Sequence, residues 1–165
     1  MKKFRLASFL LVLSLLLVAL AVPVVAHEGR EVGEYQIVFG WRLEPAYTNI
    51  LNGPEFTVAP HGGGHSEEAE GSHDDTDSDH ASDGITGLED TLQIEVTYGG
   101  QSKILRLRAV YGEPGSYTAD LIPTQPGDYS FRIFGKIGDV EVDETFDSSK
   151  GEFSTVEPIT DIQFP

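Results

Sequence analysis

Cysteine is absent from all 165 residues of the chain. This absence excludes disulfides, thiolate-bound zinc sites and a cysteine nucleophile. The core must therefore hold together by packing alone.

Basic residues are scarce, since 11 Lys and Arg stand against 27 Asp and Glu and give a formal net charge of −16. Nucleic acid and anionic lipid surfaces are poor partners for such a chain, whereas cations and cationic proteins are favoured. Acidity that only keeps the protein soluble is the alternative interpretation.

The N-terminus reads as a secretory signal peptide over residues 1–26, because a short cationic segment precedes an apolar run that ends in small residues. We expect cleavage between Ala26 and His27, with a cut after Ala21 as a competing site. Retention as an uncleaved membrane anchor is also open, because the apolar run is nearly long enough to span a bilayer. No cysteine follows the run, which excludes a diacylglyceryl anchor. The expected location is extracytoplasmic, meaning periplasmic, secreted or cell-surface.

The remaining 139 residues, with a net charge of −19 after loss of three cations, fit one domain. Helical periodicity is missing, and apolar and polar residues alternate in short runs bounded by Gly, Pro and Asp. This pattern predicts an all-β protein, an antiparallel immunoglobulin-like β-sandwich of about seven strands over residues 27–147. Residues 148–165 read as a polar C-terminal tail without a strand pattern. The expected strands lie within 33–43, 55–59, 91–98, 102–112, 116–122, 128–137 and 139–146.

Two aromatic residues sharpen this prediction. Tyr129 follows Gly-Asp and precedes Phe131 by two positions, which is the arrangement of a tyrosine corner at the start of a late strand. An ordinary half-buried strand tyrosine is the alternative. Trp41 is expected to be a core aromatic.

A long insertion, residues 60–87, interrupts the strand pattern. Four of the five histidines and seven carboxylates lie between His61 and His80, among glycines and small residues. Closing such a loop costs only about 1.4 kcal/mol more than closing a short one, so folding tolerates it. Its composition predicts disorder in the absence of a ligand.

The chemistry of this insertion suits a divalent transition metal. Neutral imidazoles bind Cu²⁺ or Zn²⁺, and neighbouring carboxylates complete the coordination shell or orient the rings. Asp75, Asp77 and Asp79 match the start of an EF-hand loop, but the sixth position is His80 and the twelfth is Thr86, so no dedicated calcium site follows. The candidate metal ligands are His61, His65, His73, His80, Asp75, Asp77 and Asp79.

His27 is a further candidate ligand. If cleavage leaves it as the first residue, its α-amino group and its imidazole can chelate one copper ion together. A coincidence of the processing site is the alternative.

Catalysis has little support in the sequence. Every histidine lies at the expected mature terminus or in the insertion, so a nucleophilic serine has no histidine on the scaffold to activate it. We therefore expect a protein that is not an enzyme and has no catalytic residues.

The run YTADLIPTQPGDYSFRIFGKIG, residues 117–138, resembles the late strands of the YtkA-like extracytoplasmic domains, which implies an immunoglobulin-like fold over 35–146 without the insertion. A chain that opens with histidine on a small sandwich also resembles the CopC-like copper proteins. That resemblance implies copper held by a terminal histidine with a further His and Asp from late strands. Only His27 matches, because the late segment offers Asp139 and Asp143 but no histidine.

Together these features predict an exported metal-binding protein that serves metal handling or homeostasis, with a divalent metal ion as its partner. The alternative is a cell-surface or periplasmic interaction module that binds another exported or membrane protein and uses the loop as a solvated spacer.

Overall fold

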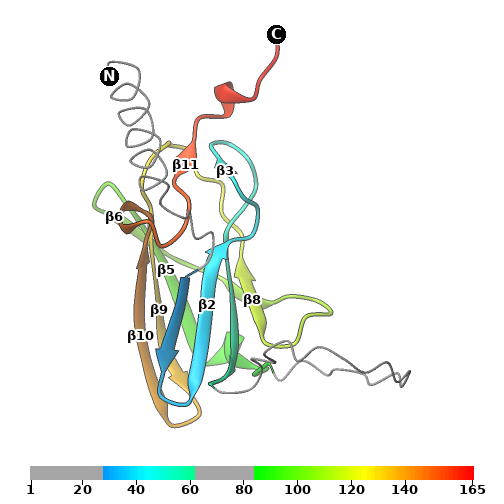
Figure 1. Cartoon of the computed structure of the whole chain (residues 1–165), viewed down its shortest axis with the longest axis vertical. Helices are drawn as coiled ribbons and strands as arrows, with labels where there is room; N and C mark the ends of the chain where they lie inside the picture. The colour runs from blue at the N-terminus through cyan, green and yellow to red at the C-terminus, as the bar shows by residue number, and fades with distance from the viewer. Residues whose placement is uncertain (1–27, 62–83) are drawn as a thin grey trace, which may run out of the picture.

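The computed structural model describes residues 28–61 and 84–165. This part of the chain is all-β, with eleven strands, three short 3₁₀ turns and no α-helix. Across the same residues there is no helix that could cross a membrane. The predicted all-β class and the predicted antiparallel sheets are therefore confirmed (Figure 1).

Two antiparallel sheets make up most of the fold, and a short parallel pair lies beside them. The five-stranded sheet has the order β1 (Glu28–Val32), β2 (Tyr35–Trp41), β4 (Pro54–Pro60), β8 (Ser116–Ala119) and β7 (Leu107–Ala109). The four-stranded sheet has the order β10 (Val140–Asp147), β9 (Ser130–Ile137), β5 (Leu92–Tyr98) and β6 (Gln101–Leu105). The parallel pair is β3 (Ala46–Tyr47) with β11 (Val156–Glu157).

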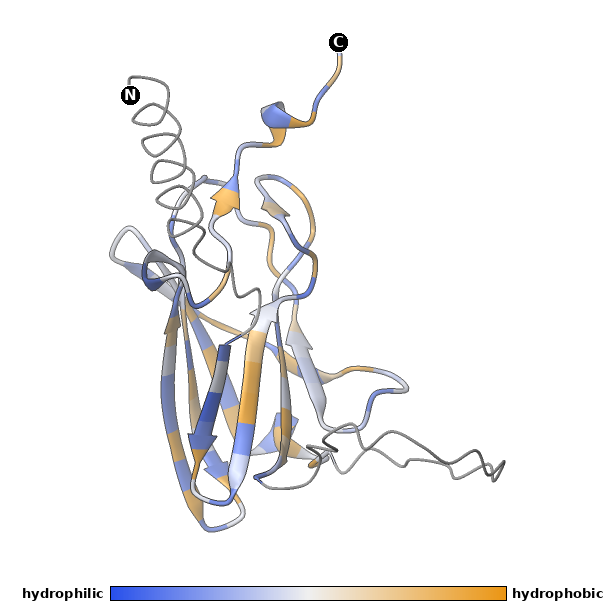
Figure 2. Ribbon diagram, viewed as in Figure 1, coloured by the Kyte–Doolittle hydropathy of each residue, from blue (hydrophilic) through white to orange (hydrophobic). Residues whose placement is uncertain are grey.

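The core lies between the two sheets. Hydrophobic and hydrophilic residues alternate along strands such as β10, as the period of a half-buried strand requires (Figure 2). Phe39 of β2 stacks on Phe146 of β10 with ring centroids 4.5 Å apart and lies 5.4 Å from Phe131 of β9. Aromatic contacts of this kind join the layers directly.

Trp41 and Tyr129 are both buried in this core. Trp41 is 2% exposed, as expected, and its Nε1 donates to the carbonyl of Ser154 at 2.8 Å. The hydroxyl of Tyr129 donates to the carbonyl of Gln125, four residues upstream, at 3.0 Å. Phe131, two residues later, is fully buried. This is the hydrogen bond that a tyrosine corner makes.

The first strand differs from the prediction. The structure places a hairpin here, because β1 runs before the expected start at residue 33 and pairs antiparallel with β2. Gly33 adopts a φ of 62° between the two strands, which a glycine allows in a two-residue turn.

The expected strand over residues 102–112 is split between the two sheets. β6 ends at Leu105 and pairs with β5, whereas β7 starts at Leu107 and pairs with β8. Arg106 is therefore the point at which the chain leaves one sheet for the other. Leu105 and Leu107 are buried, whereas Ala109 is exposed.

The C-terminal segment also corrects an expectation. Within residues 148–165, which were expected to lack a strand pattern, β11 pairs with β3, and Val156 also bridges Gly127. Phe153 and Val156 are buried in the core. The first part of this segment therefore contributes to packing.

Candidate functional site

His61 is the predicted metal ligand that the structure describes, and it lies immediately after β4. Its backbone N–H donates to the carbonyl of Glu34 at 2.6 Å, which fixes it beside the β1–β2 turn. Its Nδ1 lies 3.5 Å from Oε1 of Glu31 on β1. The side chains of His61 and Glu31 are 49% and 68% exposed.

Glu31 and His61 form an exposed pair in which a carboxylate oxygen lies near one ring nitrogen. A carboxylate beside Nδ1 favours the proton on that nitrogen and leaves Nε2 free to accept a metal. The exposed position of the ring leaves that second nitrogen accessible to solvent and ions.

The chain returns from the insertion onto the same strand that it left. The N–H of Ile85 donates to the carbonyl of Val58 at 2.9 Å. Val58 and His61 are three residues apart in an extended segment, about 10 Å. The residues that flank 62–83 are therefore attached near one another, His61 at the β1–β2 turn and Ile85 on β4.

The hydroxyl of Tyr117 secures this return. It donates to the carbonyl of Ile85 at 2.6 Å and accepts from the N–H of Leu88 at 3.1 Å. Leu88 begins the 3₁₀ turn η1 (Leu88–Asp90), and its side chain is buried. The predicted loop boundary at residue 87 thus includes a few residues that are bound to the scaffold.

Two glycines allow the returning chain to cross the end of β8. A Cβ added to Gly115 would lie 2.4 Å from the Cα of Gly84, and one added to Gly84 would lie 2.1 Å from the carbonyl oxygen of Pro114. No side chain fits at either position without a shift of backbone.

The other predicted ligands lie outside the described residues. These are His27, His65, His73, His80, Asp75, Asp77 and Asp79. Among the residues that the structure does describe, no group of three or more His, Asp or Glu side chains is arranged to hold a metal. Glu28, the neighbour of His27 in the chain, begins β1 at the end opposite to the turn that His61 contacts.

Sequence reasoning missed Glu31 as the neighbour of His61. The residue belongs to β1, and the expected first strand began after it. The Gly33-Glu34 pair, a glycine-first two-residue turn, was the signal that could have placed Glu31 in a hairpin beside β2.

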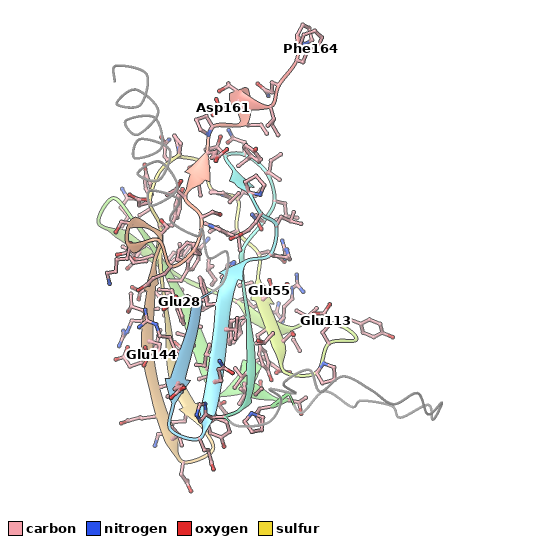
Figure 3. All side chains as sticks on the ribbon, in the orientation of Figure 1. Glu28, Glu55, Glu113, Glu144, Asp161 and Phe164 are labelled. Atoms are coloured by element: carbon pink, nitrogen blue, oxygen red, sulfur yellow. The ribbon has the colours of Figure 1, made fainter. Side chains whose placement is uncertain are left out.

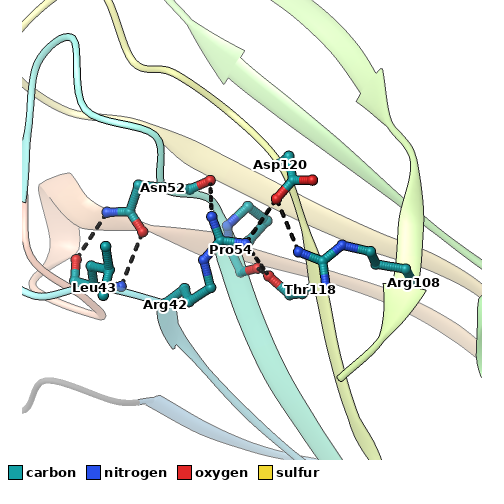
Figure 4. Close-up of polar contacts among 7 residues, drawn as sticks. All are labelled: Arg42, Leu43, Asn52, Pro54, Arg108, Thr118 and Asp120. Carbon is teal, nitrogen blue, oxygen red and sulfur yellow. Dashed lines mark hydrogen bonds and ion pairs between the residues drawn. The ribbon is translucent and has the colours of Figure 1, made fainter. Parts of the chain in front are cut away.

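A second polar cluster joins β7, β8 and the segment after β2 (Figure 4). Oδ1 of Asp120 accepts from Arg42 at 2.8 Å and from Arg108 at 3.0 Å. These hydrogen bonds, first that of Arg42 and then that of Arg108, lower the pKa of Asp120 below its ordinary value. Asn52 also accepts from Arg42 and exchanges two hydrogen bonds with the backbone of Leu43.

A third cluster joins the edges of the two sheets, where Glu28 on β1 and Glu144 on β10 lie near one another (Figure 3). Arg30 lies 3.5 Å from Glu28 and 3.6 Å from Glu144, and it donates to Glu152 at 2.6 Å. Its guanidinium also lies over the ring of Phe146, 5.3 Å from the centroid. The ion pairs and the ring contact tie β1 to β10 at this edge.

Comparisons with known proteins assign no family to the chain: no family model matches it, and neither curated proteins nor solved structures match.

Proposed function

We propose that this protein is an exported, non-enzymatic protein that binds a divalent transition metal, Cu²⁺ or Zn²⁺, through its His-rich insertion. His61 supplies the ligand at the base, and the remaining ligands are His65, His73, His80, Asp75, Asp77 and Asp79, with His27 as a further candidate. Metal handling or homeostasis is the role that such capture would serve.

The observation that carries this proposal is the pairing of His61 with Glu31. The carboxylate lies 3.5 Å from Nδ1, on the side of the ring where a carboxylate partner of a metal-binding histidine is found. Metal-binding histidines commonly have such a partner. This contact supports His61 as the first ligand of the proposed site.

Closure of the insertion at its base supports a shared site. The residues that flank 62–83 are both fixed to the scaffold, since His61 donates to Glu34 in the β1–β2 turn and Ile85 donates to Val58 on β4. Holding both ends of a loop raises the effective concentration of the ligands that it carries. Binding must still order the ligands, and this entropy cost limits the affinity to the weak-to-moderate range.

The proposed fold is an immunoglobulin-like sandwich of the YtkA-like kind. Its support is the hydrogen bond from Tyr129 to Gln125 together with the buried Phe131. The copper site of CopC-like proteins is not proposed, because the late strands β9 and β10 carry no histidine.

The test is replacement of His61, His65, His73 and His80 by Ala, with bound metal measured by mass spectrometry after gel filtration at neutral pH. We expect most metal uptake to be lost, and the thermal unfolding of the metal-free domain to stay nearly unchanged. Uptake by the parent protein should also fall near pH 5, because imidazole ordinarily titrates near ~6.5 and must be neutral to bind a metal.

A single substitution tests the part of the site that the structure describes. Glu31→Gln should weaken metal binding about tenfold, as loss of an orienting carboxylate does. Glu34→Gln, with the same charge change in the same hairpin, is the matched control and should have little effect. If the quadruple variant still bound metal, the insertion would be only a spacer, and the interaction module would be the better interpretation.

A further inference from the structure

The separation of β6 from β7 opens a groove on the side of the molecule opposite to Arg30. The groove has a volume of about 850 Å³ and lies between the start of β5 and the strand β7. β7 is the last strand of its sheet, with β8 as its sole neighbour in the strand order. One wall of the groove is therefore an open strand edge.

The hydrogen-bond pattern fixes which backbone groups of β7 point into this edge. The N–H of Val110 donates to the carbonyl of Ser116 at 2.9 Å, so Val110 is turned toward the β8 side. Antiparallel ladders alternate, which turns Arg108 toward β8 as well and turns Leu107 and Ala109 away from it. Each of these two residues directs its N–H and C=O toward the open edge.

The opposite wall follows the same alternation. The carbonyl of Thr91 accepts from the N–H of Lys136 in β9, so the backbone of the next residue, Leu92, is turned away from β9. The pairing of β5 with β6 ends at Ile94 and Leu105. Continuing this register would bring Leu107 opposite Leu92, but the chain has by then moved to the other sheet.

The side chains give the groove a floor and a charged rim. Leu92, Leu105 and Leu107 are buried beneath it. The rim carries both signs of charge, with Glu89 and Asp90 by the start of β5 and the two arginines on the other wall. Arg108 binds Asp120, whereas Arg106 is exposed and has no ion pair within residues 28–61 and 84–165. A free guanidinium in a chain of net charge −16 is a site for a carboxylate.

We propose that this groove binds an extended segment of a partner protein, which adds to β7 as a further strand and places an Asp or Glu side chain against Arg106. Backbone pairing to Leu107 and Ala109 supplies the binding, and Arg106 selects the side chain. The groove uses none of the proposed metal ligands, so this inference stands independently of metal binding.

The test uses the full chain and two fluorescent peptides of alternating Val and Thr, one with a central Asp and the other with Lys at that position. Fluorescence anisotropy should show about tenfold tighter binding of the Asp peptide. Arg106→Glu should abolish this preference. Lys103→Glu, the same charge change on the neighbouring strand β6, is the matched control and should retain it.

Amide hydrogen exchange distinguishes strand pairing from a purely electrostatic contact, because such a contact would not change the exchange rate of backbone amides. The Asp peptide should slow exchange of the Ala109 amide about tenfold, while the Val110 amide, already bonded to Ser116, should not change. The inference is overturned if neither peptide binds at about 1 mM, or if binding leaves the exchange of Ala109 unaltered. Measuring bound metal on the same samples keeps this result separate from the metal proposal.

Discussion

Tyr117 links the core to the base of the insertion through a single hydroxyl. The side chain is 1% exposed, its ring stacks on Phe56 at 5.5 Å, and its oxygen bonds to the backbone of both Ile85 and Leu88. A buried hydroxyl with two backbone partners holds the returning chain against the sheet more firmly than packing alone would.

Tyr117→Phe should lower the free energy of unfolding by about 1–3 kcal/mol, because it leaves a carbonyl and an N–H without their partner in a buried place. Urea denaturation measures this loss. Tyr98→Phe is the matched control, since the hydroxyl of Tyr98 donates to the carbonyl of Pro126 at an exposed site. Equal losses in the two variants would contradict the role given to Tyr117.

The dependence of stability on pH provides a second check on Tyr117. Burial raises the pKa of this phenol above 10. The stabilisation from the neutral hydroxyl is therefore fully present below the unfolded pKa and is lost as the pH rises through the folded pKa. Tyr117→Phe should show a shallower loss of stability in alkaline solution than the parent protein.

At the scale of elements, local signals in the sequence mark two of the hairpins. Gly99-Gly100 joins β5 to β6, and Gly138-Asp139 joins β9 to β10, both in the register that two-residue turns give. No local signal predicts that the chain passes from one sheet to the other at Arg106. Apolar residues alternate unbroken from Leu105 to Ala109, and that period is the same whichever strand lies alongside.

The candidate site, too, was predictable from the sequence only in part. His61 was identified from composition, because a histidine among carboxylates is visible in the sequence itself. The contacts with Glu31 and with Glu34 join residues about 30 positions apart. They depend on the pairing of β2 with β4 as well as on the β1–β2 hairpin, and no local pattern specifies the pairing of β2 with β4. Phe153 and Val156 were missed for a related reason, since the apolar residues of the segment 148–165 do not alternate with polar ones as those of a strand do.

The crossing of Gly84 over Gly115 gives a prediction about this connection. Gly115→Ala should destabilise the fold by about 3 kcal/mol or more, because the new methyl group meets backbone on two sides as well as a left-handed φ of 81°. Gly112→Ala, at a φ of 82° with nothing within 4 Å, should cost only the conformational strain of about 1–2 kcal/mol.

Thermal unfolding of the two glycine variants measures the difference. Because the two φ angles match, the difference in stability between the variants reports mainly the close approach of the backbone at Gly115. A similar melting temperature for both would mean that residues near Gly84 move aside without cost.

At the scale of the whole molecule, the fold depends on aromatic packing between its layers, as a chain without cysteine must. Phe39 contacts rings from β9 and β10 as well as Phe153 from the C-terminal segment. One side chain thus joins both sheets and the segment that follows the last long strand.

Phe39→Ala should therefore cost about 3–5 kcal/mol, the usual penalty for removing a buried aromatic ring. Phe134→Ala is the comparison, because this ring is half-buried under the guanidinium of Arg132 on the outer face of β9, and its loss should cost much less. Guanidinium denaturation of both variants measures the two penalties. Similar losses of unfolding free energy in the two variants would show that packing between the sheets is not the main source of stability.

The backbone attachments on either side of residues 62–83 have a consequence for what this scaffold can carry. Its two anchor points, His61 at the rim and Ile85 beside Val58, are held by backbone hydrogen bonds that any side chain sequence between them would leave intact. The sequence between these anchors can therefore be exchanged. Grafting a peptide that is selective for a different ion should change which ion the domain binds.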